Sequence, residues 1–368
     1  MVNNKMKIGI ITFHCSYNFG SALQAWALYS VIQGMGHDPK IIDYRGRDFN
    51  QYKIIRVDTA RGFLGSIASL PKNIERKSSF ESFLSAQFRM TPRYGADDLE
   101  RMESELPEQF DCFVCGSDQI WNLDCTGGPV APFFLSFACE RRRVAYAPSL
   151  SHTSFSQENF GPVQQEWVRD WLSDYFAISV REASTAPLFQ PLASTQIDVC
   201  LDPTLLLDAH SYAPITSSVP EAAGTLFVYM LERNDQLVAY VGRLAREMGV
   251  AVSYVSRHRI DFGVDARNYY GVGPSEFLGL IRDSAAVVTN SFHATVFSLL
   301  FGTPFQTFAT EHSGSRMIEL LSALDEDDHL FNGATFELPV PSDVVAMRPR
   351  LERLRASSRA FLCRALAE

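Results

Sequence analysis

The stretch that decides the fold runs Ala285-Ala-Val-Val-Thr-Asn290, then Ser291-Phe-His293, then Ala294-Thr-Val-Phe-Ser-Leu-Leu-Phe301. The first run is short, apolar and β-branched, which is typical of a buried parallel strand. The last run has helical spacing and ends at Gly302 and Pro304, which together stop a helix. The polar triplet therefore lies where a strand leaves a sheet and a helix begins. In open α/β sheets ligands bind at that edge, and the first amides of the helix favour an anion.

Two interpretations of the triplet remain open from this segment alone. A titratable His293 beside an anion site suggests proton-transfer chemistry. The alternative is an ordinary strand-to-helix turn, with Ser291 as the N-cap and His293 half-buried.

The same alternation of strands and helices extends along the chain. The first half opens with a strand at 8–12, a polar loop at 14–21 and a helix that ends at Gly34. Further strands are expected at 41–44, 113–114, 144–146, 176–180 and 197–201, and in the second half at 225–231, 251–256, 285–290 and 304–309. Helices are expected at 235–248, 274–283 and 315–324.

The 368 residues suggest two domains. We expect an α/β fold with two Rossmann-like, doubly wound domains facing each other across a cleft. The expected boundaries are 1–208 for the N-terminal domain, 209–224 for a linker rich in Ser, Pro and Ala, and 225–340 for the C-terminal domain. A helical tail, broken near Pro349, is expected at 341–368.

The composition narrows the class of protein. Hydrophobic residues make up 46% of the chain and charged residues 20%, as in a globular protein with a sizeable core. The net charge of -9 argues against general nucleic-acid binding. No signal peptide and no bilayer-spanning apolar stretch is expected, so any membrane contact would be peripheral.

Seven cysteines, an odd number, do not form a disulfide framework, which favours a reducing cytoplasm. Cys112 and Cys115 form a C-x-x-C, but on a strand positions i and i+3 point to opposite faces, so they do not share a metal. No cluster with metal-ligand spacing is found. In the charged helical segment 56–106, Phe80, Phe83, Leu84 and Phe88 form an apolar stripe; core packing is favoured over a role as an acceptor lid.

Polar clusters follow four of the expected strands. Asn18-Phe-Gly20-Ser precedes the first helix, and it lacks the G-x-G-x-x-G spacing of a dinucleotide site. Gly116-Ser117-Asp118-Gln119 follows the strand at 113–114. Ser179-Val-Arg181-Glu182 ends another strand, where Arg181 either binds a phosphate or carboxylate or pairs with Glu182 on the surface. The fourth cluster is the triplet ending in His293.

Taken in order, these segments resemble the polysaccharide pyruvyl transferase family along most of the chain. The segments that carry the resemblance are Ile8-Gly-Ile-Ile-Thr-Phe with Asn18-Phe-Gly and Ala22-Leu-Gln-Ala, Val114-Cys-Gly-Ser-Asp-Gln-Ile-Trp-Asn122, Ala145-Tyr-Ala-Pro-Ser149, Ile178-Ser-Val-Arg-Glu182, Leu201-Asp-Pro203, and Thr289-Asn-Ser-Phe-His-Ala294 with Gly302-Thr-Pro-Phe305. The match is loosest at 56–106 and after Leu324.

The resemblance implies two Rossmann-like domains in the glycosyltransferase-B arrangement, with the acceptor on the N-terminal side and the donor on the C-terminal side. It implies phosphoenolpyruvate as the donor substrate, without a further cofactor or metal. It also implies a sugar or lipid-linked oligosaccharide as acceptor, which receives a pyruvate ketal for a bacterial surface polysaccharide. Such a protein would be cytoplasmic, with any membrane contact at the inner face.

The site residues carried over are few. His293 and Arg181 map onto the histidine and the strand-end arginine of the family, and Asp118 is a carboxylate candidate for the acceptor hydroxyls. The expected substrate-binding residues are Asn18, Gly20, Ser117, Gln119, Ser149, Ser291 and Arg316. Many members carry Arg where this chain has Ser291, and Arg316 is the candidate replacement.

Two other functions stay open. A nucleotide-sugar glycosyltransferase would use Glu311 and Glu319, which some such enzymes place at this spacing for the donor sugar and ribose. His312, between Glu311 and Ser313, is expected at the surface. A non-catalytic glycan- or anion-binding relative is the second alternative, to which Ser291 gives some support.

Overall fold

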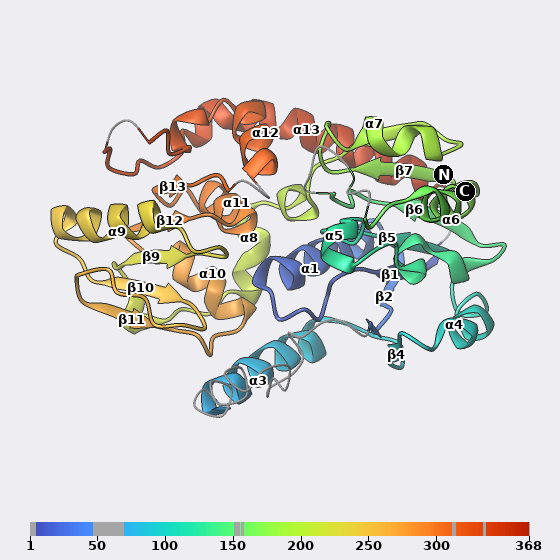
Figure 1. Cartoon of the computed structure of the whole chain (residues 1–368), viewed down its shortest axis with the longest axis horizontal. Helices are drawn as coiled ribbons and strands as arrows, with labels where there is room; N and C mark the ends of the chain where they lie inside the picture. Colours follow the sequence, from blue (N-terminus) through green and yellow to red (C-terminus); the bar gives the residue numbers. More distant parts are fainter. Residues whose placement is uncertain are drawn as a thin grey trace. The chain divides into compact units, whose positions relative to one another are not determined.

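The computed structural model of the chain describes residues 5–46, 70–150, 155, 158–310, 314–333 and 336–367. These residues form two compact units, each with its own parallel sheet (Figure 1). The first unit takes its residues from Met1–Lys53, Leu84–Leu207 and Arg353–Glu368, and the second from Ile54–Phe83 and Asp208–Glu352. The two parallel sheets confirm the expected α/β fold class.

The first unit is built on a six-stranded parallel sheet with the order β2-β1-β5-β6-β7-β8. Its strands are β1 (Lys7–Ile11), β2 (Asp38–Ile41), β5 (Cys112–Cys115), β6 (Arg142–Ala145), β7 (Ala177–Val180) and β8 (Ile197–Val199). A small parallel pair, β3 (Tyr44–Arg45) and β4 (Tyr94–Gly95), belongs to the same unit. All four residues of β5 are buried, as expected for a central strand covered on both faces.

Helices and aromatic side chains complete this unit. The helices are α1 (Phe19–Gly34), α4 (Leu99–Glu105), α5 (Leu123–Thr126), α6 (Pro162–Leu172) and α7 (Ala186–Phe189). Trp121, which follows the loop after β5, is fully buried and stacks on Phe134 with the ring centroids 5.1 Å apart. Phe189 of α7 packs on the same indole, at 4.9 Å. This aromatic core fixes the chain just beyond the loop that follows β5.

The second unit has a five-stranded parallel sheet with the order β11-β10-β9-β12-β13. Its strands are β9 (Leu226–Tyr229), β10 (Val252–Val255), β11 (Ala266–Asn268), β12 (Ala286–Thr289) and β13 (Phe305–Thr307), and its helices are α8 (Ala209–Tyr212), α9 (Asp235–Met248), α10 (Pro274–Arg282), α11 (Phe292–Phe301) and α12 (Gly314–Leu324). The edge strand β11, with its partly exposed Ala-Arg-Asn sequence, was not expected from the sequence.

Two long helices contribute residues to both units. They are α3 (Leu70–Gln87) and α13 (Val344–Ala365). The stripe Phe80, Phe83, Leu84 and Phe88 is buried, as core packing requires. The rest of the charged segment before Leu70, residues 56–69, lies outside the described residues.

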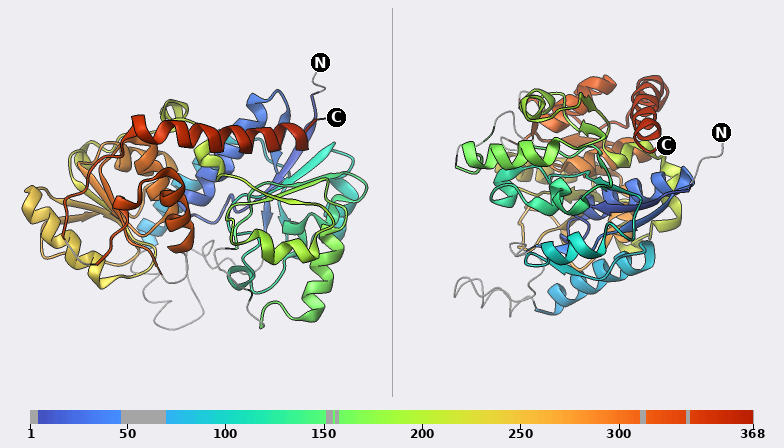
Figure 2. Two further views of the ribbon diagram at one scale, coloured as in Figure 1. Left: turned by 90° about the horizontal axis from the view of Figure 1, so that it is seen from above. Right: turned by 90° about the vertical axis from the view of Figure 1, so that its right-hand side faces the viewer.

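The expected break near Pro349 is wrong, because α13 continues through that residue. Figure 2 shows the helix as one uninterrupted ribbon. Proline removes one backbone donor, and the carbonyl left without it belongs to Val345, a residue that is 84% exposed. Met347, Leu351, Phe361 and Leu362 are buried along the helix, so packing offsets the missing hydrogen bond.

The residues expected as a linker, 209–224, carry short helical turns. Tyr212 of α8 is fully buried and packs edge-on against Phe297 with a centroid distance of 5.0 Å. Among the described residues, none of the helices combines the length and the apolar character needed to cross a bilayer.

Candidate functional site

Each sheet has one place where the strand order reverses. In the first unit the chain moves outward from β1 to β2 on one side and through β5 to β8 on the other. In the second unit the reversal lies between β9 and β12. Ligands of open α/β sheets bind in the crevice beyond the carboxyl ends of the strands at such points. The loops after β1 and β5, and those after β9 and β12, are therefore the candidate site regions.

The loop after β5 begins at a position that only glycine fills. Gly116 has φ of +107°, and a Cβ added there would lie 2.2 Å from the carbonyl oxygen of Tyr146. An L side chain is disfavoured by both the backbone angle and the contact. The close approach lets the loop cross directly over the end of the neighbouring β6.

Ser117 is held on every polar atom by residues far away in the sequence. Its amide donates to Oε1 of Gln24 at 3.1 Å, and its carbonyl accepts from Oγ1 of Thr12 at 2.9 Å. The hydroxyl donates to the carbonyl of Ala147 at 2.6 Å. Ser117 is fully buried, so its position is set by β1, α1 and the chain after β6 together.

Arg181, at the end of β7, lies inside this network. Its guanidinium donates to Oγ of Ser117 at 2.7 Å and pairs with Oδ2 of Asp202 at 2.9 Å. The side chains of Arg181 and Asp202 are 4% and 0% exposed. The surface pair with Glu182 that the sequence allowed is wrong, because both residues are buried and Glu182 accepts instead from Ser149 (2.7 Å) and Thr185 (3.1 Å).

Asp118 follows in a left-handed conformation, with φ of +67°. Its Oδ2 accepts a 2.5 Å hydrogen bond from the hydroxyl of Ser21 on α1, and its carbonyl accepts from the amide of Ser149 at 2.8 Å. The residue is 6% exposed. The loop therefore presents a carboxylate that already binds a hydroxyl group.

The remaining predicted residues of this unit have mainly local contacts. Asn18 caps α1, and its Oδ1 accepts from the amides of Gly20 (2.9 Å) and Ser21 (3.4 Å). Gly20 is buried in the first turn of that helix. Gln119 is half-buried and accepts from the side-chain amide of Asn122 at 3.2 Å.

In the second unit the loop between β12 and α11 has the geometry of a capped helix start. The side chain of Ser291 accepts from the amide of Ala294 at 3.5 Å. Asn290 joins this loop to the loop after β9, since it accepts from the amide of Leu231 and donates to the carbonyl of Glu232, both at 2.7 Å. His293 is the second residue of α11 and is 7% exposed.

Phe292 lies beside both predicted polar groups of this unit. Its ring centroid is 5.2 Å from that of His293, and the guanidinium carbon of Arg316 on α12 lies 5.4 Å from it. Arg316 is 6% exposed. The structure thus places His293 and Arg316 beside the ring of Phe292, which directly follows Ser291 in the chain. Glu319 is half-buried on α12, whereas Glu311 and His312 lie outside the described residues.

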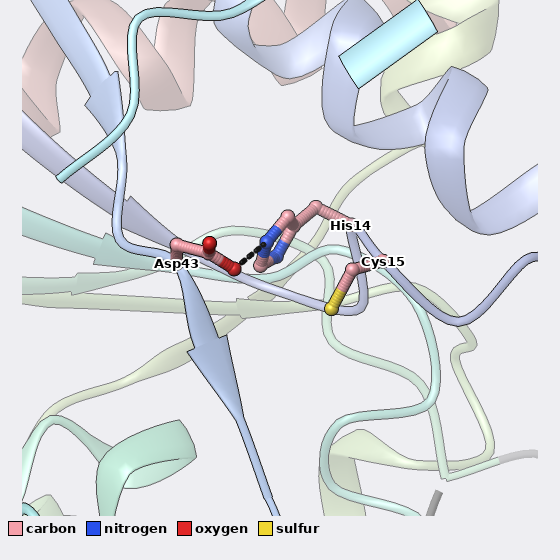
Figure 3. A group of neighbouring side chains, drawn as sticks. All are labelled: His14, Cys15 and Asp43. Atoms are coloured by element: carbon pink, nitrogen blue, oxygen red, sulfur yellow. Dashed lines mark hydrogen bonds and ion pairs between the residues drawn. The ribbon is translucent and has the colours of Figure 1, made fainter. Parts of the chain in front are cut away.

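Sequence reasoning missed a buried cluster at the carboxyl edge of the first sheet. Nε2 of His14, in the loop after β1, lies 3.0 Å from Oδ1 of Asp43, and Nδ1 lies 3.2 Å from the carbonyl of Thr12 (Figure 3). Nε of Arg45 lies 2.8 Å from the same carboxylate oxygen, and Cys15 is adjacent. The signal available in the sequence was a His-Cys pair after one strand and an Asp after the next.

The charges of this cluster shift the pKa of both its acid and its base. Burial alone would lower the pKa of His14, but Cys15 and the hydrogen bond to Asp43 outweigh burial and raise it to about 10. Burial would raise the pKa of Asp43, but its hydrogen bonds with His14 and Arg45 hold it well below the usual range. Protonated His14 and ionised Asp43 therefore stabilise each other.

A comparison with protein families agrees with the sequence resemblance. The profile of the polysaccharide pyruvyl transferase family matches residues 18–312. Similar solved structures include the S. aureus MnaA–UDP co-structure (11% identity, 98% of this chain and 91% of that chain, TM-score 0.48), an alpha-glucosyltransferase in complex with UDP (10%, 98% and 94%, 0.49) and Arabidopsis thaliana UGT89C1 complexed with UDP-L-rhamnose (11%, 99% and 94%, 0.48). No curated protein gives a significant match. Because the family match spans most of its length, the chain belongs to the polysaccharide pyruvyl transferase family and is an enzyme.

Proposed function

We propose that this enzyme transfers the pyruvyl group of phosphoenolpyruvate to a sugar of a surface polysaccharide or of its lipid-linked precursor. The products are a pyruvate ketal and inorganic phosphate. The observation that carries the proposal is the grouping of His293, Arg316 and the start of α11 at the strand-order reversal of the second sheet. Membership of the family supplies the reaction class.

The donor demands fixed positive groups, because phosphoenolpyruvate carries a phosphate and a carboxylate. Arg316 provides a buried guanidinium, and the first turn of α11 provides the positive end of a helix dipole. The ring of Phe292 lies beside Arg316, and the amides of the helix start are held by the backbone of α11. Preorganised groups of this kind stabilise charge that develops in the transition state. Arg316 thereby supplies the positive charge that many family members have from an arginine at the position of Ser291.

The chemistry begins with proton transfer. The methylene carbon of the donor takes a proton and C2 becomes electrophilic; one sugar hydroxyl then attacks C2. Phosphate leaves, and the second hydroxyl closes the ketal. An imidazole donates or accepts a proton near neutral pH, and we assign that role to His293, with a contribution of about 10²–10⁴-fold to the rate.

The acceptor hydroxyls need a carboxylate, and we assign Asp118. Its carboxylate accepts a hydrogen bond from the hydroxyl of Ser21, which supports a role in binding hydroxyl groups. We infer that Arg181 acts through Ser117, by holding the loop that carries Asp118, since its guanidinium contacts Ser117 and Asp202. The segments near Asp118 are then shaped by Asn18, Gly20, Gln119 and Ser149.

The test measures phosphate release from phosphoenolpyruvate with a panel of galactosides, glucosides and mannosides, and identifies the ketal by mass spectrometry. His293→Ala should lower turnover about 10²–10⁴-fold. The control is His258→Ala, at an exposed position of the same unit. Unchanged turnover in His293→Ala with an intact fold would remove this residue from the mechanism.

A thermal-shift titration distinguishes pyruvyl transfer from the alternative function, a nucleotide-sugar glycosyltransferase. Stabilisation follows RT ln(1 + [L]/Kd), so even a millimolar ligand shifts the melting temperature. Phosphoenolpyruvate should stabilise the enzyme, and a preference for nucleotide sugars would favour a glycosyltransferase. Family membership argues against the non-catalytic alternative.

A further inference from the structure

We propose that His14, Cys15 and Asp43 bind a transition-metal ion, with Zn²⁺ the expected one. One nitrogen, one sulfur and one carboxylate oxygen from these residues all lie within 4.8 Å of one another. The three residues are 0%, 1% and 6% exposed. Figure 3 shows the imidazole directed at the carboxylate, with the sulfur beside it.

The topology explains why these residues meet. His14 and Cys15 follow β1, and Asp43 follows β2, which pairs with β1 in parallel. The carboxyl ends of neighbouring parallel strands lie at the same edge of a sheet. His14 and Cys15 precede residues 18–312, the part of the chain that matches the family, whereas Asp43 lies within it. None of the three residues has a role in the proposed pyruvyl transfer, so the two proposals are tested separately.

The donor types select the metal. Imidazole nitrogen with cysteine sulfur suits zinc and related transition metals, whereas Mg²⁺ and Ca²⁺ prefer sets made only of oxygen. Zinc–ligand bonds of about 2.0–2.3 Å place tetrahedral ligand atoms closer together than 4.8 Å. Binding should therefore draw the three side chains inward. Three protein ligands leave one position of a tetrahedron for water or a substrate oxygen.

The neighbours of the cluster already orient two of the ligands. Nδ1 of His14 faces the carbonyl of Thr12 at 3.2 Å, which leaves Nε2 as the nitrogen for the metal. Nε of Arg45 fixes the carboxylate of Asp43 at 2.8 Å. Partners of this kind are typical of metal sites, and their loss costs about 10–100-fold in affinity.

Charge makes Cys15 the decisive ligand. Arg45 lies beside Asp43, and Nε of Arg93 lies 3.6 Å from its other oxygen, so two cations offset the charge of this carboxylate. The thiolate must then supply much of the negative charge that a divalent ion needs. Binding is an exchange: the ion enters, the Nε2 proton of His14 and the Sγ proton of Cys15 leave, and no electron is transferred.

The experiment uses the full chain and cobalt as a spectroscopic substitute for zinc. The apoprotein is titrated with Co²⁺, the near-ultraviolet thiolate-to-cobalt absorption is recorded, and zinc content is measured after dialysis. We expect one ion per chain and a sulfur-to-cobalt band. Cys15→Ser should abolish the band and lower zinc content at least about tenfold.

Cys112→Ser is the matched control, because Cys112 is also buried in the first unit and burial raises the pKa of its thiol to about 12. This variant should keep both the band and the zinc. Absence of the band in the unaltered chain, or its persistence in Cys15→Ser, would overturn the proposal. The unaltered chain decides the question even if a variant fails to fold.

Discussion

The loop after β5 in the first unit and the loop after β12 in the second occupy equivalent places in their sheets but are stabilised differently. Ser117 is fixed by contacts from β1, α1, β7 and the chain after β6. Ser291, in contrast, caps its own helix, and its amide donates to Thr289 at 3.0 Å. Long-range contacts fix Ser117, whereas the hydrogen bonds of Ser291 are local; in the second loop the long-range contacts belong to Asn290.

This difference bears on how mutations in each loop affect the stability of the protein. The cation that contacts the first loop, Arg181, forms an ion pair with the buried carboxylate of Asp202. The second loop carries His293 on the first turn of a helix, where backbone geometry places it directly. Mutations should therefore affect stability more at the first loop than at the second.

The largest stability effect should come from the buried ion pair. Arg181→Leu leaves Asp202 as a buried charge without this partner, and we expect a loss of about 3–5 kcal/mol in the free energy of unfolding. Urea denaturation measures it. Arg364→Leu breaks an exposed pair with Asp198 at 3.2 Å and should cost less than about 1 kcal/mol. Equal losses in the two variants would contradict the buried role of Arg181.

The next effect concerns the backbone of the first loop. Gly116→Ala forces a methyl group against the Tyr146 carbonyl at φ of +107°, and backbone strain alone costs about 1–3 kcal/mol. Gly127 also has a positive φ, +69°, but has open space around it. Gly127→Ala should therefore be the milder change in thermal melting. The opposite order would show that the loop after β5 relaxes easily.

The smallest effect should come from the second loop. Ser291→Ala removes the N-cap of α11 and should cost about 0.5–2 kcal/mol, because one helix amide loses its side-chain acceptor. Ser291→Gly should cost only a few tenths of a kcal/mol. Chemical denaturation of the two variants measures the difference. If Ser291→Ala lost as much free energy of unfolding as Arg181→Leu, Ser291 would have to stabilise the protein through more than the cap of its own helix.

Much of the fold follows from sequence patterns. Helix α9 has the bounds that its spacing predicts, and the strand–turn–helix around Ser291 does too within two residues. Such elements are set by local periodicity and by caps. The edge strand β11 could not be predicted, because a short, partly polar strand has no clear sequence pattern. A helix that continues through Pro349 could not be predicted either, because the packing along α13 is not visible in the sequence.

The site was predictable where it depends on strand ends. The sequence places Asp118 in a loop after a strand and His293 where a strand gives way to a helix; Asp118 follows β5, and His293 lies in the first turn of the helix that follows β12. The partners of Arg181 were not predictable, because Ser117 and Asp202 reach it from distant segments. The cluster of His14, Cys15 and Asp43 was missed for the same reason: pairing of β1 with β2 brings it together.

Gln24 of α1 has one further consequence. Its side-chain nitrogen donates to Oγ1 of Thr12 at 2.9 Å and to the carbonyl of Ser21 at 3.0 Å, while its oxygen accepts from the amide of Ser117. A carboxylate or a thioether of similar length offers no donor in that place. Relatives that replace this amide should therefore show compensating changes at positions 12 and 117, so that the three sites vary together during evolution.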